Sequence, residues 1–123
     1  MIPEKLLQVL KYEGVVAIVT MGDNGPHVVN TWNSYIQLTE DEHILIPVGG
    51  MIQTEANIEN NHDILMTLGT REVDGFRGPG TGFLINGTAT FTESGNSFDL
   101  VKAKFPWIRA TLDVSNLNAT QTL

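Results

Sequence analysis

The sequence predicts a mainly β protein: a small antiparallel barrel of about five or six strands with peripheral helices, built as one domain over residues 1–123. Strand-like segments recur at short spacing, and most are joined by turns rather than by crossover helices. The clearest segment alternates, with Phe83, Ile85 and Ala89 on one face and polar residues on the other, as a half-buried antiparallel strand requires. A length of 123 residues and a mass of 13.5 kDa also suit a single domain.

The order of the elements follows from apolar periodicity, turn residues and helix-ending residues. We expect a helix at 3–12, strands at 15–19, 27–38 and 44–48, a helix at 51–60, strands at 64–69 and 83–92, a helix at 97–105 and a last strand at 109–114. The glycine-rich residues at 74–82 predict a loop. Within it, a hairpin or bulge at Gly78–Gly82 is favoured over a phosphate cradle, because the segment precedes a strand.

Three residues or runs predict local features of these strands. The continuous apolar run Val15–Val19 suits a strand that is covered on both faces. Pro47 cannot donate a hydrogen bond to a neighbouring strand, so we expect it at a sheet edge or at an opening. Gly87 in the middle of a strand indicates a bend or a bulge.

Charge and composition exclude several function classes. Seven basic and fourteen acidic residues give a net charge of −7, so the protein repels nucleic-acid phosphates and anionic lipid surfaces. We expect no nucleic-acid and no membrane partner. The longest unbroken apolar stretch, 15–19, is far too short to span a bilayer, and the first residues do not resemble a signal peptide. The sequence therefore predicts a soluble, cytoplasmic protein.

The absence of cysteine excludes disulfides, thiolate catalysis, iron–sulfur clusters and cysteine-based zinc sites. His27, His43 and His62 do not have metal-ligand spacing, so no metal site is expected. No nucleophile and no acid–base pair stands out as catalytic. Any redox chemistry must therefore come from a bound cofactor.

Three segments concentrate groups that a ligand could use. Asn30–Tyr35 places amides, hydroxyls and two large aromatic residues at the end of a strand. Pro47–Thr54 leads from a strand through two glycines into a helix, whose free backbone N–H groups suit an anion. Trp107 follows a proline and could cover a flat ring. Together the segments indicate a site for a planar heterocycle that carries a phosphate.

Each segment also has a simpler interpretation. A tryptophan on a barrel strand, such as Trp32, is more often a core residue than a ligand platform. Gly49–Gly50 by itself is usually no more than a strand-to-helix turn. From the residues alone, a phosphorylated cofactor and an ordinary packing role both remain open.

The chain also resembles a known family in an ordered set of segments that spans its whole length. The segments are Glu13–Ile18, Gly25–His27, Val29–Tyr35, Pro47–Met51, Thr54–Asn57, Leu65–Gly69, Gly78–Ile85 and Gln121–Leu123. They are similar to the pyridoxamine 5′-phosphate oxidase-like FMN-binding split β-barrels, in particular to small members from sulfate-reducing bacteria. The resemblance implies an antiparallel split barrel that forms a homodimer and holds FMN near the subunit interface.

The resemblance also implies roles for individual residues. The FMN-binding set would be Asn30, Thr31, Trp32, Ser34, Tyr35, Pro47, Val48, Gly49, Gly50, Gln53, Thr54, Trp107 and Leu123. The phosphate would lie near Thr31, Ser34, Gln53 and Thr54, and the ring system against Pro47, Val48, Gly49 and Gly50, surrounded by Trp32, Tyr35 and Trp107. The C-terminal Leu123 would reach the flavin of the partner subunit.

One position departs from the family pattern. Where related sequences carry a lysine just before Thr54, this chain has Gln53, so a direct cation for the phosphate is lost. Arg71 is the nearest candidate replacement in the sequence, and Glu13, which the resemblance places near the cofactor, could lower the potential of a reduced, anionic flavin.

The function that the resemblance favours is non-covalent FMN binding and electron transfer between redox donor and acceptor proteins. Two alternatives remain open: a module that stores or senses FMN without turnover, and a small flavin-dependent oxidoreductase that reduces a substrate with a nicotinamide cofactor. The chain has no nicotinamide fingerprint, and its 123 residues hold no counterpart of the substrate-binding extensions of full-length pyridoxamine 5′-phosphate oxidases.

Overall fold

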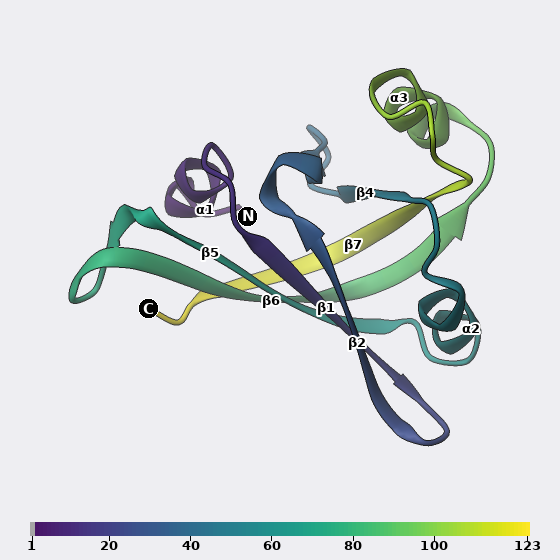
Figure 1. Cartoon of the computed structure of the whole chain (residues 1–123), viewed down its shortest axis with the longest axis horizontal. Coiled ribbons are helices and arrows are strands. Elements are labelled where there is room, and N and C mark those ends of the chain that lie inside the picture. The colour runs from purple at the N-terminus through teal and green to yellow at the C-terminus, as the bar shows by residue number, and fades with distance from the viewer. Residues whose placement is uncertain (1) are drawn as a thin grey trace.

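The computed structural model describes residues 2–123, and these form one seven-stranded antiparallel sheet in the order β2-β1-β5-β6-β7-β4-β3 (Figure 1). The strands are β1 Val15–Gly22, β2 Gly25–Trp32, β3 Gln37–Leu38, β4 Ile44–Val48, β5 Asp63–Gly75, β6 Gly78–Thr92 and β7 Ala110–Gln121. The helices are α1 Glu4–Val9, α2 Ile52–Asn60 and α3 Asn96–Lys104, with a short 3₁₀ helix, η1, at Asn33–Tyr35. The predicted fold class, an antiparallel split barrel with peripheral helices, is confirmed.

The sheet curls around a core that its inner face supplies. Val16 and Ile18 of β1, Ile46 of β4, and Phe83 and Ile85 of β6 are all buried in one cluster. A second, smaller cluster joins Leu45, Val101 and Ile108, so α3 covers the outer side of the β4 region. The barrel is split where the chain passes from β2 through η1 to β3, because these two strands are the opposite edges of the sheet.

The long hairpin of β5 and β6 replaces the loop that the sequence predicts at 74–82. Pairing continues to Asp74↔Pro79 and Gly75↔Gly78, so this glycine-rich segment is strand on both sides of a tight turn. Gly78 and Gly80 have φ angles of 114° and 108°, which residues with a side chain rarely adopt. The two glycines therefore allow the strand to continue through this segment instead of ending it. The expectation of a loop was wrong, whereas the local preference for a hairpin or bulge at Gly78–Gly82 is confirmed.

Other boundaries also differ from the sequence prediction. The chain is not extended throughout 27–38, because η1 interrupts it at Asn33–Tyr35. The last strand runs to Gln121 instead of ending at 114, since it pairs with β6 as far as Phe83↔Gln121. The first helix is shorter than predicted and ends at Val9. The structure has seven strands because β3 is formed separately after η1.

Two predictions of local strand features are confirmed. The pairing of β6 with β7 shifts between Asn86↔Asn118 and Thr88↔Ser115, which places Gly87 opposite a bulge in β7. A side chain at Gly87 would lie 2.7 Å from the carbonyl oxygen of Ser115, so the bulge needs a glycine there. Pro47 lies beyond the short pairing of β3 with Ile44 and Leu45, at the edge where no donor is required.

The strand at Val15–Val19 is not covered on both faces. Val16 and Ile18 point into the core, whereas Val15 is half exposed on the outer face. The same outer face carries Val28 of β2 and Leu65 of β5, both exposed, in register with Val19 between them. The β-branched run therefore fits a half-buried strand whose outer side is apolar. Among residues 2–123, no helix is long and apolar enough to cross a membrane.

Candidate functional site

The turn between β4 and α2 places one of its two glycines, Gly49, beside an indole ring. A side-chain carbon at Gly49 would lie 3.3 Å from Cζ3 and 3.4 Å from Cε3 of Trp107, so the ring lies against the backbone of Gly49. At Gly50 the same atom would meet no described atom within 4 Å. Trp107 itself remains 52% exposed. The turn therefore offers exposed main chain next to a flat aromatic surface.

An aromatic cluster connects η1 with the segment between α3 and β7 beside this turn. The ring of Tyr35, which follows β2, lies 5.8 Å from the ring of Trp107 and 5.2 Å from that of Phe105. Phe105 and Trp107 meet edge to face at 6.0 Å. Such tilted contacts stabilise aromatic pairs. They fix Trp107 beside Gly49 and connect it to the predicted segment Asn30–Tyr35.

The start of α2 carries an unsatisfied buried hydroxyl. Thr54 lies in the first turn of the helix and is fully buried, and its Oγ1 has no hydrogen-bond partner among the described residues. Helix N-termini leave N–H groups free and have a partial positive charge, so they favour anions. Met51, just before the helix, has the left-handed angles φ 58° and ψ 37°. A non-glycine residue in this region is uncommon and marks a constrained turn.

Side chains on α2 fix the helix to β1. The Gln53 Nε2 group donates to Asn57 Oδ1 at 2.8 Å, and Asn57 Nδ2 donates to Thr20 Oγ1 at 3.1 Å. The amide of Gln53, which replaces the expected lysine, is therefore engaged along the helix.

Arg109 is a site residue that the sequence reasoning missed. Its Nη2 donates to the Gly50 carbonyl oxygen at 2.6 Å, and its Nε donates to the same oxygen at 3.2 Å. Nη2 also lies 2.9 Å from Oε1 of Glu55. Arg109 does not belong to any sequence motif. Only its position two residues after a candidate ring-stacking residue could have indicated it.

Ser34, a predicted phosphate ligand, is already bound to a carboxylate. Oε1 of Glu13 accepts a hydrogen bond from the backbone N of Ser34 at 3.0 Å, and Oε2 accepts one from its hydroxyl at 2.6 Å. These hydrogen bonds from Ser34, the side-chain one first, lower the pKa of Glu13 below its ordinary 4.5. Ser34 therefore offers an anion two donors, and within this chain Glu13 occupies them.

The remaining predicted residues of β2 lie on two faces. Thr31 points inward and is buried, whereas Asn30 and Trp32 lie on the exposed outer face. Asn30 Nδ2 donates to the Val16 carbonyl oxygen at 3.4 Å. Trp32 is 45% exposed, so it is not the core residue that the simpler interpretation expected.

Leu123 and Arg71 lie together in another part of the molecule. The C-terminal residue packs against Gly75, Gly80 and Gly82 of the β5–β6 hairpin. Arg71 and Leu123 line a hollow of about 600 Å³, which Glu13 also borders. Arg71 lies eight residues after the start of β5, so roughly 26 Å of strand separates it from the end of α2. It is not placed to serve the start of that helix.

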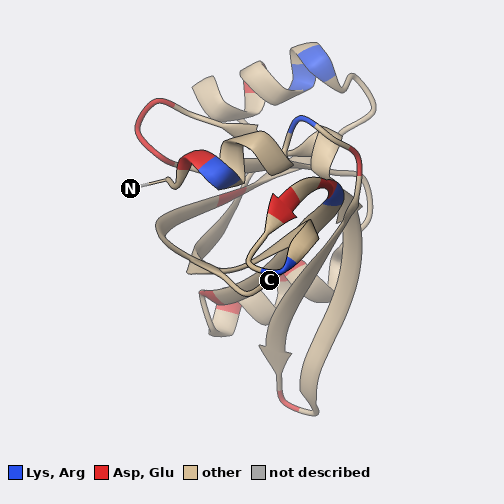
Figure 2. Cartoon of the chain, turned by 90° about the vertical axis from the view of Figure 1, so that its left-hand side faces the viewer, with Lys and Arg blue, Asp and Glu red and all other residues tan. Residues whose placement is uncertain are grey.

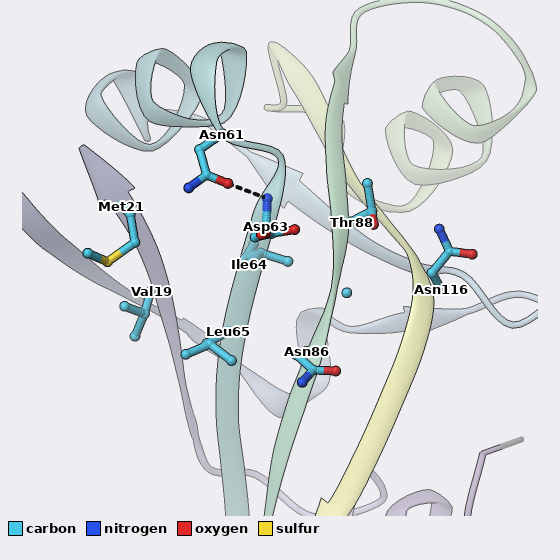
Figure 3. Close-up of a pocket in the computed structure, with 10 residues that line it drawn as sticks. Val19, Met21, Asn61, Asp63, Ile64, Leu65, Asn86, Thr88 and Asn116 are labelled. Atoms are coloured by element: carbon cyan, nitrogen blue, oxygen red, sulfur yellow. Dashed lines mark hydrogen bonds between the residues drawn. The ribbon is translucent and has the colours of Figure 1, made fainter. Parts of the chain in front are cut away.

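A further hollow of about 480 Å³ lies on the outer face of β1, β5 and β6 (Figure 3). Val19 and Leu65 line its apolar side, and the amides of Asn61 and Asn86 line its polar side. None of the predicted cofactor residues borders it. In the part of the chain that the structure describes, no group of histidine and acidic side chains is arranged to hold a metal ion.

Comparison with known proteins gives a consistent family and fold. The profile of the family described as "Pyridoxamine 5'-phosphate oxidase" matches residues 2–116. A curated protein named "FMN-binding protein", from Nitratidesulfovibrio vulgaris, is 52% identical over 123 residues and covers all of both chains. Both comparisons agree with the resemblance that the sequence segments predict.

Solved structures show the same fold at low identity. HupZ of Group A Streptococcus superposes with a TM-score of 0.78 at 19% identity, over 99% of this chain and 96% of that one. An FMN-binding protein from Syntrophomonas wolfei has a TM-score of 0.68 at 15% identity, over 98% of this chain and 86% of that one. At such identities the superpositions establish the architecture alone.

Proposed function

This chain belongs to the pyridoxamine 5′-phosphate oxidase family, and from that premise we propose that it binds FMN without a covalent bond and acts as a redox protein in electron transfer. The observation that carries the proposal is that one turn connects Gly49, which packs against Trp107, with a helix whose first turn holds the buried, unpaired hydroxyl of Thr54. FMN combines a flat ring system with a phosphate. The turn beside Trp107 would bind the ring system, and the start of α2 would bind the phosphate.

The ring end of the site fits a flat heterocycle. Trp107 and Tyr35 provide aromatic surface, and the open space at Gly50 leaves the main chain accessible. A ligand ring stacked there would gain contact area with the indole and hydrogen bonds with peptide groups. A bulky residue at position 49 would fill the space in contact with Trp107.

The phosphate end fits the beginning of α2. The N–H groups of the first turn and the Thr54 hydroxyl, which lacks a described partner, are the donors that an anion needs. Bound FMN would supply the electron transfer itself, and the protein sets its orientation, its exposure and the surrounding charge. A protein with a net charge of −7 disfavours a further negative charge on the ring, which lowers the reduction potential.

The electron-transfer role is supported by exposure of the ring site. Because Trp107 is 52% exposed, the site opens at the surface, where a donor or acceptor protein could approach closely. FMN storage predicts the same binding but no faster reoxidation than that of free flavin. An oxidoreductase predicts saturable oxidation of a nicotinamide cofactor.

We also propose that the functional form is a homodimer. Val15, Val28, Leu65 and Leu84 are exposed on one outer face of β2, β1, β5 and β6. An extended apolar face on a small protein usually marks an interface. A second copy would cover this face and bring Leu123 of one subunit toward the flavin of the other.

The test begins with the visible spectrum of the purified protein and identification of any chromophore released by heat. Titration with FMN should then raise the melting temperature, because ligand at about 100 times its dissociation constant stabilises the folded state by about 2.7 kcal/mol. Rapid reduction by a one-electron donor protein and transfer to an acceptor protein would support the redox role. A protein that stays colourless and does not bind added FMN contradicts the whole proposal.

A further inference from the structure

The guanidinium group of Arg109 is held at the start of α2 by both of the elements that form the turn. It donates twice to the Gly50 carbonyl oxygen, at 2.6 and 3.2 Å, and pairs with Glu55 at 2.9 Å. The backbone N of Arg109 donates to the Val48 carbonyl oxygen at 2.9 Å. Its side chain also lies over the Phe91 ring, 6.0 Å from the centroid. Arg109 is therefore fixed in place at the turn.

The contact with Gly50 has a consequence for the next peptide N–H. In a planar trans peptide the carbonyl and the N–H point in opposite directions. Arg109 fixes the direction of the Gly50 carbonyl, so the N–H of Met51 points away from the guanidinium. The left-handed conformation of Met51, with φ 58°, is uncommon and needs such support. Arg109 thereby sets the orientation of the main chain that leads into the helix.

The same contact places a positive charge beside Glu55 in the first turn of α2, whereas Gln53 of that turn is uncharged. The basic residues are few, and two of them, Lys102 and Lys104, lie on α3 (Figure 2). Arg71 lies far along β5, as described above. Arg109 is the basic residue whose described contacts are with the turn and the first turn of α2. Glu55 lies next to it and partly neutralises its charge.

We propose that Arg109 is the positioning residue that gives this site its preference for a phosphorylated ligand, and that Glu55 attenuates that preference. This inference rests on the proposed function. It predicts that the two side chains act in opposite directions on ligands with a phosphate. It also predicts that neither has a comparable effect on the same ring system without a phosphate.

The experiment compares FMN with riboflavin, which shares the ring system but lacks the phosphate. In titrations of the full chain, Arg109→Gln should weaken FMN binding by about tenfold and riboflavin binding by less than about threefold, because a nearby charge mainly affects the charged ligand. Glu55→Gln should tighten FMN binding by roughly threefold, with riboflavin unchanged. Added salt should reduce both differences, because it screens partly exposed charges.

Matched variants separate local charge from total charge. Lys11→Gln and Glu59→Gln make the same changes in net charge, the first just after α1 and the second one turn further along α2. We expect the first to leave FMN affinity unchanged and the second to have less effect than Glu55→Gln. Arg109→Lys keeps the charge without the planar fork, and it should retain most of the preference for FMN over riboflavin.

The outcomes distinguish this inference from the proposed function. If the unmodified protein binds neither FMN nor riboflavin, the proposed function fails. If it binds FMN but Arg109→Gln weakens the binding of FMN and of riboflavin equally, Arg109 has only a structural role and the inference is overturned. Unchanged FMN affinity in Glu55→Gln also overturns it. If Arg109→Gln does not fold, the results for Glu55→Gln and Arg109→Lys decide.

Discussion

Glu13 holds Ser34 through both carboxylate oxygens, with Oε1 3.0 Å from the backbone N and Oε2 2.6 Å from the hydroxyl. Glu13 follows α1 and Ser34 lies in η1, so the contact ties the segment before β1 to the segment after β2. It lies one residue from Tyr35 of the aromatic cluster. The Ser34 hydrogen bonds favour the charged carboxylate and thereby lower the pKa of Glu13.

The lowered pKa of Glu13 predicts a pH-dependent contribution to stability. A carboxylate with a lower pKa in the folded state stabilises it fully above the unfolded-state value, which is near 4.5, and loses this effect as pH falls through the folded-state pKa. Denaturant unfolding at about pH 7 and about pH 3 should therefore show that Glu13→Gln lowers the stability more at the higher pH than at the lower one. Because Glu13 is exposed, the difference should be small. An equal difference at both pH values would contradict the assignment.

Gly49 and Gly50 provide a matched pair for the ring site. A methyl group at Gly49 would lie 3.3 Å from Trp107, whereas one at Gly50 would meet no described atom within 4 Å. We expect Gly49→Ala to displace the indole and weaken FMN binding by about tenfold, since roughly 1.4 kcal/mol of lost stacking suffices. Gly50→Ala should also weaken FMN binding, because its methyl group enters the open space that the ring would occupy, but it should leave the indole in place. Affinity is measured by titration of flavin absorbance.

Unchanged affinity in Gly49→Ala would contradict the placement of the ring against Trp107. Melting temperatures measured without ligand provide the control, because they show whether either substitution acts on the fold instead of the site. A loss of affinity without a loss of stability is the result that supports the site.

Leu65 and Leu100 provide a matched pair for the proposed dimer. Leu65 is 43% exposed on the outer face of β5, and Leu100 is 58% exposed on α3, outside that face. We expect Leu65→Glu to shift the protein from dimer to monomer in sedimentation experiments, because a charge buried in an apolar interface is strongly unfavourable. Leu100→Glu should leave the dimer intact. If Leu100→Glu dissociates the dimer and Leu65→Glu does not, the interface lies elsewhere.

Much of the fold could be predicted from local sequence patterns. The strand Ile44–Val48 and the bulge opposite Gly87 follow from apolar runs and from single proline or glycine positions. At 74–82 only a local hairpin or bulge at Gly78–Gly82 could be predicted, because the glycines have turn-forming preferences and only pairing with the neighbouring strand makes the whole segment part of a ladder. The outer face of Val15–Val19 was misjudged because a continuous apolar run does not itself show whether one or both faces of the strand are covered by the chain.

The candidate site was predictable in part, for a similar reason. Trp107 and Gly49 could be singled out by residue type, and the structure brings them together. Arg109 could not, because its importance comes from contacts with Gly50 and Glu55 that are far away in sequence. The engagement of Ser34 by Glu13 was equally hidden, since 21 positions separate the two residues.

Removal of Thr122 and Leu123 tests whether the C-terminus contributes to the partner's site. Within the chain these residues pack against Gly82 of the hairpin, and Leu123 remains 57% exposed. If the tail of one subunit covers the flavin of the other, its deletion should weaken FMN binding and expose the bound flavin to soluble quenchers. Because β7 pairs with β6 as far as Gln121, the deletion keeps that strand pairing and removes one further backbone hydrogen bond, from the Thr122 N–H to the Gly82 carbonyl oxygen at 2.8 Å. Leu123→Ala keeps the chain length and should reproduce a smaller part of the effect. Unchanged affinity and quenching in a protein that still sediments as a dimer would rule out the contribution of the tail.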